Sequence, residues 1–242
     1  MSSLMNLSTG FFITGTDTEI GKTLVAGALI LKLKEAGQIS AGFKPVAAGT
    51  YIDASGQKCN EDVETLSLAS GLNSREHVLC PYVLDEPAAP HLVAKEQDIR
   101  LDCAVILDAL GVLTTQFDAV VVEGAGGFLV PLNSQEDLGD LAQAIDLPVI
   151  LVVGMRLGCI NHALLTCEAI QSRQLSIAGW VANTLSEEMP FLEENIQTLK
   201  DRIFAPFLGV IPSLPQTFQK QANSPYSMDA LHFAAQYIRL PQ

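Results

Sequence analysis

Short, unbroken apolar runs alternate along the chain with longer segments that have helical spacing. The apolar runs are residues 11–14, 41–43, 119–122, 148–153, 177–182 and 207–211. Continuous rather than alternating hydrophobicity is typical of strands covered on both faces, as in parallel sheets. The segments of helical length between them include residues 24–33, 103–115, 162–172 and 191–203. This order predicts repeated βα units, and so an α/β fold with an open, mainly parallel sheet flanked by helices on both faces.

The same pattern gives no reason to divide the chain. Neither a Pro/Ser/Gly-rich linker nor an internal repeat interrupts the 242 residues. We therefore expect a single domain over residues 1–242, with a core of about 9–215 and a polar tail over 216–242. The tail has one short helical pattern near 228–238 and no chemistry that can be read from it. The polar, turn-rich residues 47–59 predict a long loop, which in a compact domain is often functional.

A phosphate-binding loop is indicated between the first strand and the first helix. Residues 15–23 read GTDTEIGKT, and the last three letters match the end of a P-loop. Gly21 lets the backbone curl around a phosphate, and the N–H groups at the helix start form a nest for anions. Lys22 would neutralise the outer phosphates, and the Thr23 hydroxyl can ligate Mg²⁺.

The loop departs from the usual P-loop in one respect. The first glycine normally lies six residues before the lysine, where this chain has Thr16, and Gly15 comes one residue earlier. The loop is therefore a lengthened variant, and it predicts that the single domain over residues 1–242 is a P-loop NTPase-like domain with a P-loop-type sheet. An ordinary turn rich in Gly and Thr is the alternative, but the strand before it and the helix after it favour a phosphate loop. Thr18 and Glu19 lie at the mouth of the nest, where they could face a second ligand.

Charged residues stand at or near the ends of two other predicted strands. Ligands of open α/β sheets bind outside the carboxyl ends of the strands. Lys44 follows the second strand and could place a cation on a reacting phosphate, or simply be a solvated lysine. Glu123 follows the third strand and resembles a Walker B carboxylate, with a structural acid before a turn as the alternative. Asp62 opens a predicted helix, where capping alone would justify an acid.

The last strand ends offer weaker signals. Residues 157–162 open a helix after the fourth strand, and the free N–H groups there could bind a carboxylate. Cys159 and His162 lie too close in sequence to support a catalytic triad, which favours core or capping roles for them. Asn183 follows the fifth strand and offers both a donor and an acceptor, as an adenine edge does, although Asn is also common in turns. Residues 212–214, after the sixth strand, could form the wall of a base pocket.

Taken together, these segments resemble the dethiobiotin synthetase family. The matching stretches are residues 14–23 (TGTDTEIGKT), 42–49 (GFKPVAAG), 122–127 (VEGAGG), 148–154 (PVILVVG), 157–163 (LGCINHA), 178–183 (AGWVAN) and 208–212 (LGVIP). They occur in the family's order and span nearly everything from residue 11 to about 215. The combination is highly specific, whereas GKT alone is not.

The resemblance implies an ATP- and Mg²⁺-dependent ligase. In the family, 7,8-diaminopelargonic acid takes up CO2 at one amine as a carbamate, which ATP then phosphorylates. The second amine closes a cyclic urea, giving dethiobiotin, ADP and phosphate in biotin biosynthesis. The family is a homodimer with its substrate at the interface, so we expect a homodimer here.

Residue roles carry over from the family's motifs. Lys44 would be the catalytic cation, and Thr23, Asp62 and Glu123 would bind Mg²⁺. The residues that would contact ATP are Glu19, Ile20, Gly21, Lys22, Thr23, Leu24, Asp62, Glu123, Gly124, Ala125 and Gly126, with Asn183, Thr184, Pro212, Ser213 and Leu214 on the adenine side. The residues that would contact the substrate are Thr18, Lys44 and Ala48, with Gly158, Cys159, Ile160 and Asn161 of one subunit receiving the carboxylate of the substrate bound by the other.

Two positions qualify the carry-over. Ala48 stands where the family often has Ser, so this position offers the substrate no hydroxyl. Asp62 follows a loop of variable length.

Two other classes of protein remain open: a switch ATPase, either of the partition type or an iron–sulfur carrier, and a kinase of a small acid. A partition-type switch ATPase would have a signature lysine where this chain has Asp17, and an iron–sulfur carrier would need a CxxC pair, which the sequence lacks. A kinase of a small acid is not discriminated by the sequence.

Composition and charge narrow the partners and the compartment. Hydrophobic residues make up 48% and charged residues 17%, which excludes disorder. A net charge of −13 disfavours binding to nucleic acid or to an anionic membrane surface. The N-terminus has no signal-peptide pattern, and the longest apolar run is far shorter than a membrane span. The five cysteines include no CxxC pair, so we expect reduced thiols in a cytoplasmic protein.

Overall fold

A six-stranded parallel sheet forms the centre of the computed structural model, which describes residues 10–73, 77–186 and 188–241. The strands lie in the order β10-β9-β8-β1-β7-β2, and every neighbouring pair is parallel. Their bounds are β1 (Gly10–Gly15), β2 (Ser40–Phe43), β7 (Ala119–Glu123), β8 (Val149–Met155), β9 (Ile177–Thr184) and β10 (Phe207–Ile211). Each of the six apolar runs of the sequence therefore forms a strand of one parallel sheet, as predicted.

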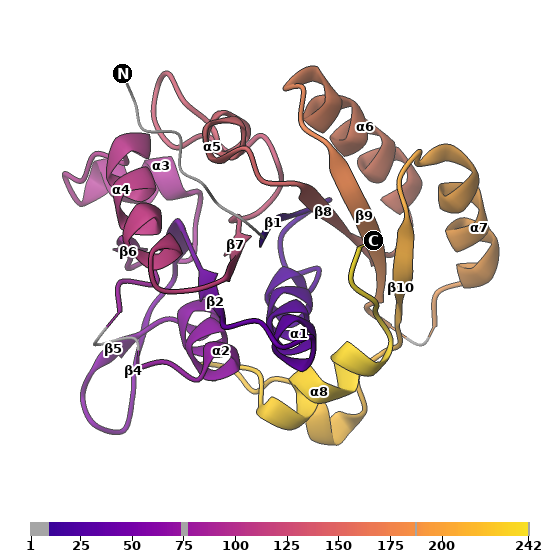
Figure 1. Ribbon diagram of the computed structural model, residues 1–242, viewed down its shortest axis with the longest axis horizontal. Coiled ribbons are helices and arrows are strands. Elements are labelled where there is room, and N and C mark those ends of the chain that lie inside the picture. The colour runs from indigo at the N-terminus through magenta and orange to yellow at the C-terminus, as the bar shows by residue number, and fades with distance from the viewer. Residues whose placement is uncertain (1–9, 74–76, 187, 242) are drawn as a thin grey trace.

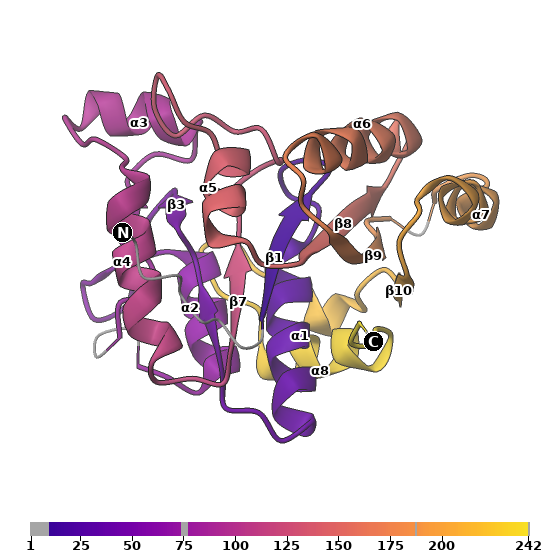
Figure 2. The same ribbon diagram turned by 45° about the horizontal axis from the view of Figure 1, so that its top comes forward.

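Helices cover both faces of this sheet (Figures 1 and 2). One face carries α1 (Lys22–Glu35), α2 (Glu61–Ser70) and α8 (Met228–Gln236). The other carries α4 (Cys103–Thr114), α5 (Leu138–Ile145), α6 (Cys159–Ser172) and α7 (Leu192–Arg202). The remaining helices are the short α3 (Pro90–Glu96) and the 3-10 turn η1 (Gln216–Phe218). None of the helices in the described part of the chain is both long enough and apolar enough to span a membrane.

The burial of β8 shows why the strand sequences are continuously apolar. Ile150 and Val152 pack into the core that α1, α2 and α8 share, whereas Leu151 and Val153 pack against α6 and α7. All four side chains are fully buried. Successive side chains of a strand point to opposite faces, so a sheet covered on both sides needs apolar residues at every position.

The order in which successive strands are added to the sheet reverses at β1, although all six strands stay parallel. After β1 the chain runs to β2 at one edge, returns to β7 beside β1, and then continues through β8, β9 and β10 on the other side. In doubly wound sheets the loop at such a reversal opens a crevice at the carboxyl ends of the strands, where ligands bind. The glycine-rich loop that follows β1 lies at this point.

The sequence pattern predicted one long loop over residues 47–59, and this prediction is wrong. These residues include most of β3 (Val46–Ala48), which pairs in parallel with β6 (Tyr82–Leu84). They also form a small hairpin from β4 (Tyr51–Ile52) and β5 (Lys58–Cys59). Asp53 organises the hairpin turn, because one of its carboxylate oxygens accepts hydrogen bonds from the backbone N–H groups of Ser55 and Gln57, both 2.8 Å long.

The hydrophobic core also extends beyond residue 215, where the sequence analysis placed its end. The helical pattern near 228–238 does form a helix, α8, and its Ala230, Leu231 and Ala234 are fully buried against α1. A Cβ atom added to Gly27 of α1 would lie 2.7 Å from Leu231. The two helices therefore approach closely because Gly27 has no side chain. The segment looked polar because only one face of so short a helix is apolar.

Candidate active site

A cavity of about 960 Å³ opens at the carboxyl ends of β1, β2 and β7. The glycine-rich loop after β1 forms one wall of it, and the start of α2 forms another. Segments 87–90, just before and at the start of α3, and 125–127, after β7, complete the opposite side. The cavity thus lies at the carboxyl ends of the strands, where ligands were expected from the sequence, and at the point where the strand order reverses.

The loop from Gly15 to Gly21 has the backbone of an anion nest. Gly21 directly precedes α1 with φ 86°, a left-handed conformation that favours glycine, and no described side chain caps the helix there. A Cβ at Gly21 would lie 2.2 Å from the amide nitrogen of Asn183. The N–H groups of the first helical turn therefore have no side-chain acceptor in the described chain, and the helix dipole adds to their attraction for anions.

Lys22 lies inside the mouth of this nest. Its ammonium group donates a hydrogen bond of 2.8 Å to the backbone carbonyl of Asp17, so the lysine folds back over the loop. Burial, together with the positive charge of Lys44, lowers the pKa of Lys22 to about 8. A polyphosphate in the nest would replace the carbonyl as the partner of Lys22 and would favour its charged form.

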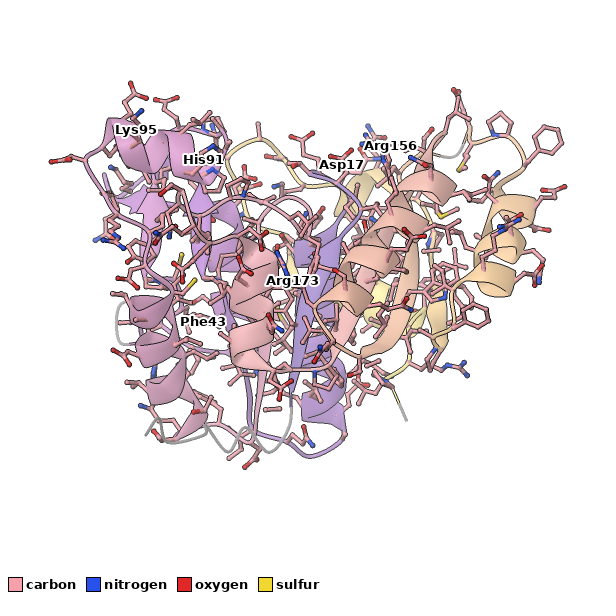
Figure 3. All side chains as sticks on the ribbon, turned by 90° about the horizontal axis from the view of Figure 1, so that it is seen from above. Asp17, Phe43, His91, Lys95, Arg156 and Arg173 are labelled. Atoms are coloured by element: carbon pink, nitrogen blue, oxygen red, sulfur yellow. The ribbon has the colours of Figure 1, made fainter. Side chains whose placement is uncertain are left out.

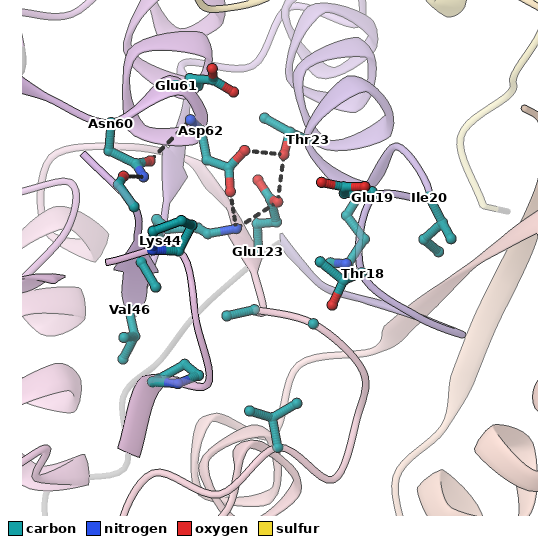
Figure 4. A pocket seen from close by; sticks show the side chains of 18 of the residues that line it. Thr18, Glu19, Ile20, Thr23, Lys44, Val46, Asn60, Glu61, Asp62 and Glu123 are labelled. Atoms are coloured by element: carbon teal, nitrogen blue, oxygen red, sulfur yellow. Dashed lines mark hydrogen bonds and ion pairs between the residues drawn. The ribbon is translucent and has the colours of Figure 1, made fainter. Parts of the chain in front are cut away.

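A buried cluster of one lysine, two carboxylates and one hydroxyl forms the floor of the cavity (Figure 4). Lys44 lies between the carboxylates, with its Nζ 2.8 Å from Asp62 Oδ2 and 2.7 Å from Glu123 Oε1. It also donates to the carbonyl of Gly124 at 3.2 Å. The Thr23 hydroxyl lies 2.7 Å from both Asp62 Oδ1 and Glu123 Oε1. Four residues from four separate segments of the chain thus converge within hydrogen-bond distance.

The two carboxyl groups of this cluster are not equivalent. Burial raises the pKa of Glu123, and the attraction of Lys44 offsets this only in part. Burial acts in the same direction on Asp62, but Lys44 and the Thr23 hydroxyl lower its pKa to about 2. For Lys44, burial works against the charge, and the two carboxylates outweigh it and raise the pKa above the ordinary lysine value. The ammonium form of Lys44 is therefore held firmly at the cavity floor.

The donor set of this cluster fits a Mg²⁺ ion. Mg²⁺ takes oxygen ligands and is commonly held by one or two carboxylates together with phosphates and water. Thr23, Asp62 and Glu123 supply a hydroxyl and two carboxylates, all oxygen donors. In addition, the buried Glu123 Oε2 has no hydrogen-bond partner among the described residues. An unpaired buried carboxylate oxygen is costly unless a cation or a donor reaches it, which favours a metal-binding role.

Most of the residues expected at the phosphates line this cavity. They are Glu19, Ile20, Gly21, Lys22, Thr23, Asp62, Glu123, Ala125 and Gly126, and the substrate candidates Thr18, Lys44 and Ala48 line it as well. Gly124 contributes its carbonyl to Lys44. Leu24 lies apart from them, since its side chain is buried in the core under α1 and only its backbone could reach a ligand.

The residues expected at adenine do not line the cavity. Asn183 is buried at the end of β9, and its amide donates a 2.8 Å hydrogen bond to the carbonyl of Ile20. The side chain thus braces the phosphate loop. The hydroxyl of Thr184 is buried and has no hydrogen-bond partner within the described chain. Residues 212–214 follow β10 on the same side of the sheet and are half-buried.

The segment from Gly158 to Asn161, expected to meet the substrate carboxylate, is also absent from the lining of this cavity. Gly158 precedes α6 with φ 94°, and no described side chain caps that helix. Leu157 beside it is fully exposed. Gly158 and Asn161 are exposed, whereas the side chain of Cys159 is buried in the core against α7, so only the backbone of Cys159 could reach a ligand.

Several cavity residues were missed by the sequence analysis. Tyr51, residues 87–90 and three residues of the tail, Lys220, Asn223 and Tyr226, all line the cavity. The paired prolines at 87 and 90 are a signal that could have marked a rigid turn, because proline fixes the backbone. No comparable signal marks the tail residues, since only the packing of α8 brings them to the cavity.

A further ion pair fixes the outer edge of the phosphate loop. Arg156, at the end of β8, pairs with Asp17 of the loop (Figure 3). Asp17 is the position where a partition-type ATPase would have its signature lysine. An acidic residue that is paired with an arginine of the same chain does not offer that positive charge.

Comparisons with known proteins agree with this geometry. A family model described as an AAA domain matches residues 9–221. The chain is similar to MinD in the MinC:MinD cell division protein complex of Aquifex aeolicus, with a TM-score of 0.53, 14% identity and 94% of each chain covered. It is also similar to the septum site-determining protein MinD complexed with Mg-ADP from Pyrococcus horikoshii OT3, with a TM-score of 0.50, 16% identity, and 86% of this chain and 83% of that one covered. These structures support the fold alone.

Curated relatives are far closer in sequence. The ATP-dependent dethiobiotin synthetase BioD of Ralstonia nicotianae is 50% identical over 213 residues, which cover 88% of this chain and 93% of the relative. The protein of the same name from Aromatoleum aromaticum is 50% identical over 202 residues, covering 84% of this chain and 89% of the relative. Because the identity is this high over most of both chains, the chain belongs to the ATP-dependent dethiobiotin synthetase family.

Proposed function

We propose that this protein is an ATP-dependent dethiobiotin synthetase of biotin biosynthesis. It joins CO2 to 7,8-diaminopelargonic acid and closes the cyclic urea ring at the expense of ATP. The observation that carries the proposal is the cluster of Lys44, Thr23, Asp62 and Glu123, which lies in the same cavity as the phosphate loop. A cation and a prospective metal site meet there beside a nest for phosphates.

The reaction proceeds in three balanced steps. One amine of the substrate attacks CO2 and loses a proton, which gives a carbamate. A carbamate oxygen attacks the γ-phosphorus of ATP, and the bond to the bridging oxygen breaks, so ADP leaves with that electron pair. The second amine then attacks the carbonyl carbon, phosphate leaves, and a proton is lost as the cyclic urea forms.

The chain's residues act mainly by positioning anions and stabilising charge. The N–H groups after Gly21 and the ammonium of Lys22 hold the phosphates, and Lys44 holds the carbamate beside the γ-phosphate. Both reactants are anionic, and the protein carries a net charge of −13, so local positive charge is needed to bring them together. The pKa of Lys44 lies above the ordinary value, because Asp62 and Glu123 outweigh the effect of burial. Lys44 therefore acts as a fixed cation rather than as a proton donor.

Thr23, Asp62 and Glu123 are the residues that would hold Mg²⁺. When bound, the ion supplies charge neutralisation to the phosphates during phosphoryl transfer. The unpaired Glu123 Oε2 supports this role, because the free oxygen is available to a metal or to one of its water ligands.

Thr18 and Ala48, which line the same cavity as Lys44, are the further residues that would contact the substrate. Ala48 has no hydroxyl, so it contributes shape and not a hydrogen bond. We propose that the protein is a homodimer in which residues 158–161 of one subunit bind the carboxylate of the substrate held by the other. Two observations support this arrangement. The segment is absent from its own subunit's cavity, and the neighbouring Leu157 is fully exposed, as an interface residue would be in a single copy.

The adenine of ATP would meet Asn183, Thr184 and residues 212–214. Asn183 already supports the phosphate loop through the carbonyl of Ile20, and the unpaired hydroxyl of Thr184 is available to the nucleotide. The partners that this function requires are small molecules: the diamine, CO2 and ATP. A cytoplasmic location fits the absence of any disulfide among the five cysteines, all of which are described and free.

Mass spectrometry of the product tests this function. The purified protein is incubated with the diamine, MgATP and ¹³C-bicarbonate. We expect dethiobiotin that carries one labelled carbon, and one ADP released for each ring closed. Release of ADP without bicarbonate would instead indicate a kinase, and hydrolysis of ATP without the diamine would indicate a switch ATPase. Either result would contradict the proposal.

A further inference from the structure

The tail crosses the open side of the cavity on its way to α8. Lys220, Asn223 and Tyr226 of this segment line the same cavity as the phosphate loop. In the sequence, they lie between residues 212–214, the segment that we propose for the adenine side, and α8, which packs on α1. The proposed reaction assigns no role to any of the three.

The segment is held firmly against the start of α2. The backbone N–H of Tyr226 donates to the hydroxyl of Thr65 at 3.1 Å, and that hydroxyl donates in turn to the carbonyl of Glu61 at 2.7 Å. Ser227 follows directly and caps α8 through the N–H of Ala230. Hydrogen bonds to α2 and to α8 therefore fix the backbone at Tyr226 and Ser227, six and seven residues after Lys220.

Lys220 extends from this fixed segment along the cavity wall. Its ammonium pairs with Glu61, and it lies 5.6 Å from the centre of the Tyr226 ring. About 28% of its side chain is exposed, so it is accessible at the rim. Glu61 immediately precedes Asp62 at the start of α2, so Lys220 lies beside the residues that form the cavity floor.

Lys220 differs from the other two lysines of the cavity in how its charge is paired. Five acidic side chains and only three lysines line the described cavity. Lys44 is held between the buried Glu123 and the partly exposed Asp62, and Lys22 closes on the phosphate loop. Lys220 is the third, and its partner Glu61 is itself partly exposed, so the pair can open without leaving a buried charge unpaired.

We propose that Lys220 is a nucleotide-binding residue. When ATP binds, the ammonium of Lys220 breaks its ion pair with Glu61 and contacts the phosphates of ATP at the rim of the cavity. The inference rests on the proposed function, because it takes ATP as the ligand of the phosphate loop. Phosphate oxygens carry more negative charge than the single carboxylate of Glu61, and a charge-assisted hydrogen bond to them is correspondingly strong. The tail thus supplies a binding group that the phosphate motif lacks.

Titration calorimetry with MgATP and ADP tests the proposal on Lys220→Gln, Lys220→Arg, Glu61→Gln and the double variant of Glu61→Gln with Lys220→Gln. Lys200→Gln is the matched control, because Lys200 also lies over an aromatic ring, that of Phe207 at 4.4 Å, but outside the cavity. For Lys220→Gln we expect nucleotide affinity to fall about fivefold to tenfold, the effect of one partly exposed charge-assisted contact. Lys220→Arg and Lys200→Gln should bind as the unchanged protein does.

The double variant separates contact from neutralisation. If Lys220 touches the phosphates, removing Glu61 as well will leave affinity low. If Lys220 only neutralises Glu61, the double variant will recover full affinity, and that recovery would overturn the proposal, as would normal affinity in Lys220→Gln. The KM for the diamine should stay unchanged in Lys220→Gln, because a general distortion of the cavity would raise it too. Lys22→Ala is measured alongside: normal ATP binding in that variant would contradict the phosphate loop itself rather than Lys220.

Discussion

Replacing Lys44 with Met tests both the chemistry and the electrostatics of the cavity floor. Methionine keeps a long unbranched side chain and removes the charge. Lys44 is 2% exposed at its side chain, and it pairs with Glu123, which is 1% exposed, and with Asp62, which is 33% exposed. Removing one partner of a buried ion pair typically costs about 3–5 kcal/mol. Because Asp62 is partly solvated, we expect the lower end, about 3 kcal/mol at pH 7.

The cost should depend on pH in a defined direction. Without Lys44, burial raises the pKa of Glu123 further, and Asp62 loses the main influence that lowers its pKa. The folded variant therefore takes up a proton as the pH falls, which relieves the repulsion between the two carboxylates. In the unchanged protein, the low pKa of Asp62 contributes stability that is present above its unfolded value and is lost as the pH falls toward 2. In the unchanged protein Asp62 keeps this contribution throughout the range from pH 7 to pH 5, so only the proton uptake by the variant acts there. It should narrow the stability difference between those pH values by up to about 1.4 kcal/mol per pH unit for one proton.

Urea denaturation measures the free energy of unfolding. The fluorescence of Trp180, the one tryptophan of the chain, reports the unfolding because this side chain is fully buried. Lys34→Met is the control, since Lys34 is exposed, donates to the carbonyl of Ala69 and leaves no carboxylate behind. A loss below about 1 kcal/mol, or a loss that is the same at both pH values, would refute the reasoning. Turnover should fall by about 10²–10³ while ATP still binds, and near-normal turnover would contradict the catalytic role.

Two further predictions concern the phosphate loop. Because burial and Lys44 lower the pKa of Lys22 to about 8, ATP binding should take up a proton above that pH, and affinity should fall as the pH rises further. Calorimetry in buffers of different ionisation enthalpy measures the uptake, and none at about pH 9 would contradict the assignment. Gly21→Ala should abolish ATP binding and should cost more stability than the control, Gly37→Ala. Both glycines have φ 86°, so the backbone strain is the same in the two variants. A Cβ at Gly21 would lie 2.2 Å from Asn183 Nδ2, whereas a Cβ at Gly37 would meet no described atom within 4 Å. Equal losses of stability in urea would show that the contact with Asn183 is unimportant.

The parts of the fold that could be predicted from sequence are those set by local pattern. The strand at 207–211 has the expected bounds, and α6 begins at Cys159, three residues before its predicted start. Short pieces without a strong pattern were not found. Helix α3 has only seven residues, and β4 and β5 have two each, so their sequences give little periodic signal. They depend on pairing and packing with distant segments.

For the cavity, the sequence located the individual groups but not their mutual contacts. Lys44 and Glu123 were expected near the carboxyl ends of neighbouring strands, and a parallel sheet brings such positions to one edge. That Lys44 bonds to both Asp62 and Glu123 depends on where α2 lies over β2, which no local pattern specifies. Asn183 was expected at adenine, and its bond to the carbonyl of Ile20 became visible only when β9 and the phosphate loop were placed side by side.

The sequence by itself determined the layered α/β architecture, the phosphate loop and the family. Periodicity and nearly contiguous motifs carry that information, because backbone geometry and anion nests are local properties of the chain. Only the tertiary structure decided that Lys220 and Tyr226 share a cavity with Lys22, and that Lys44 is held by two carboxylates. These contacts join segments far apart in sequence, and they form because the packing of α2 and α8 on α1 buries enough apolar surface to fix the position of the polar groups they carry.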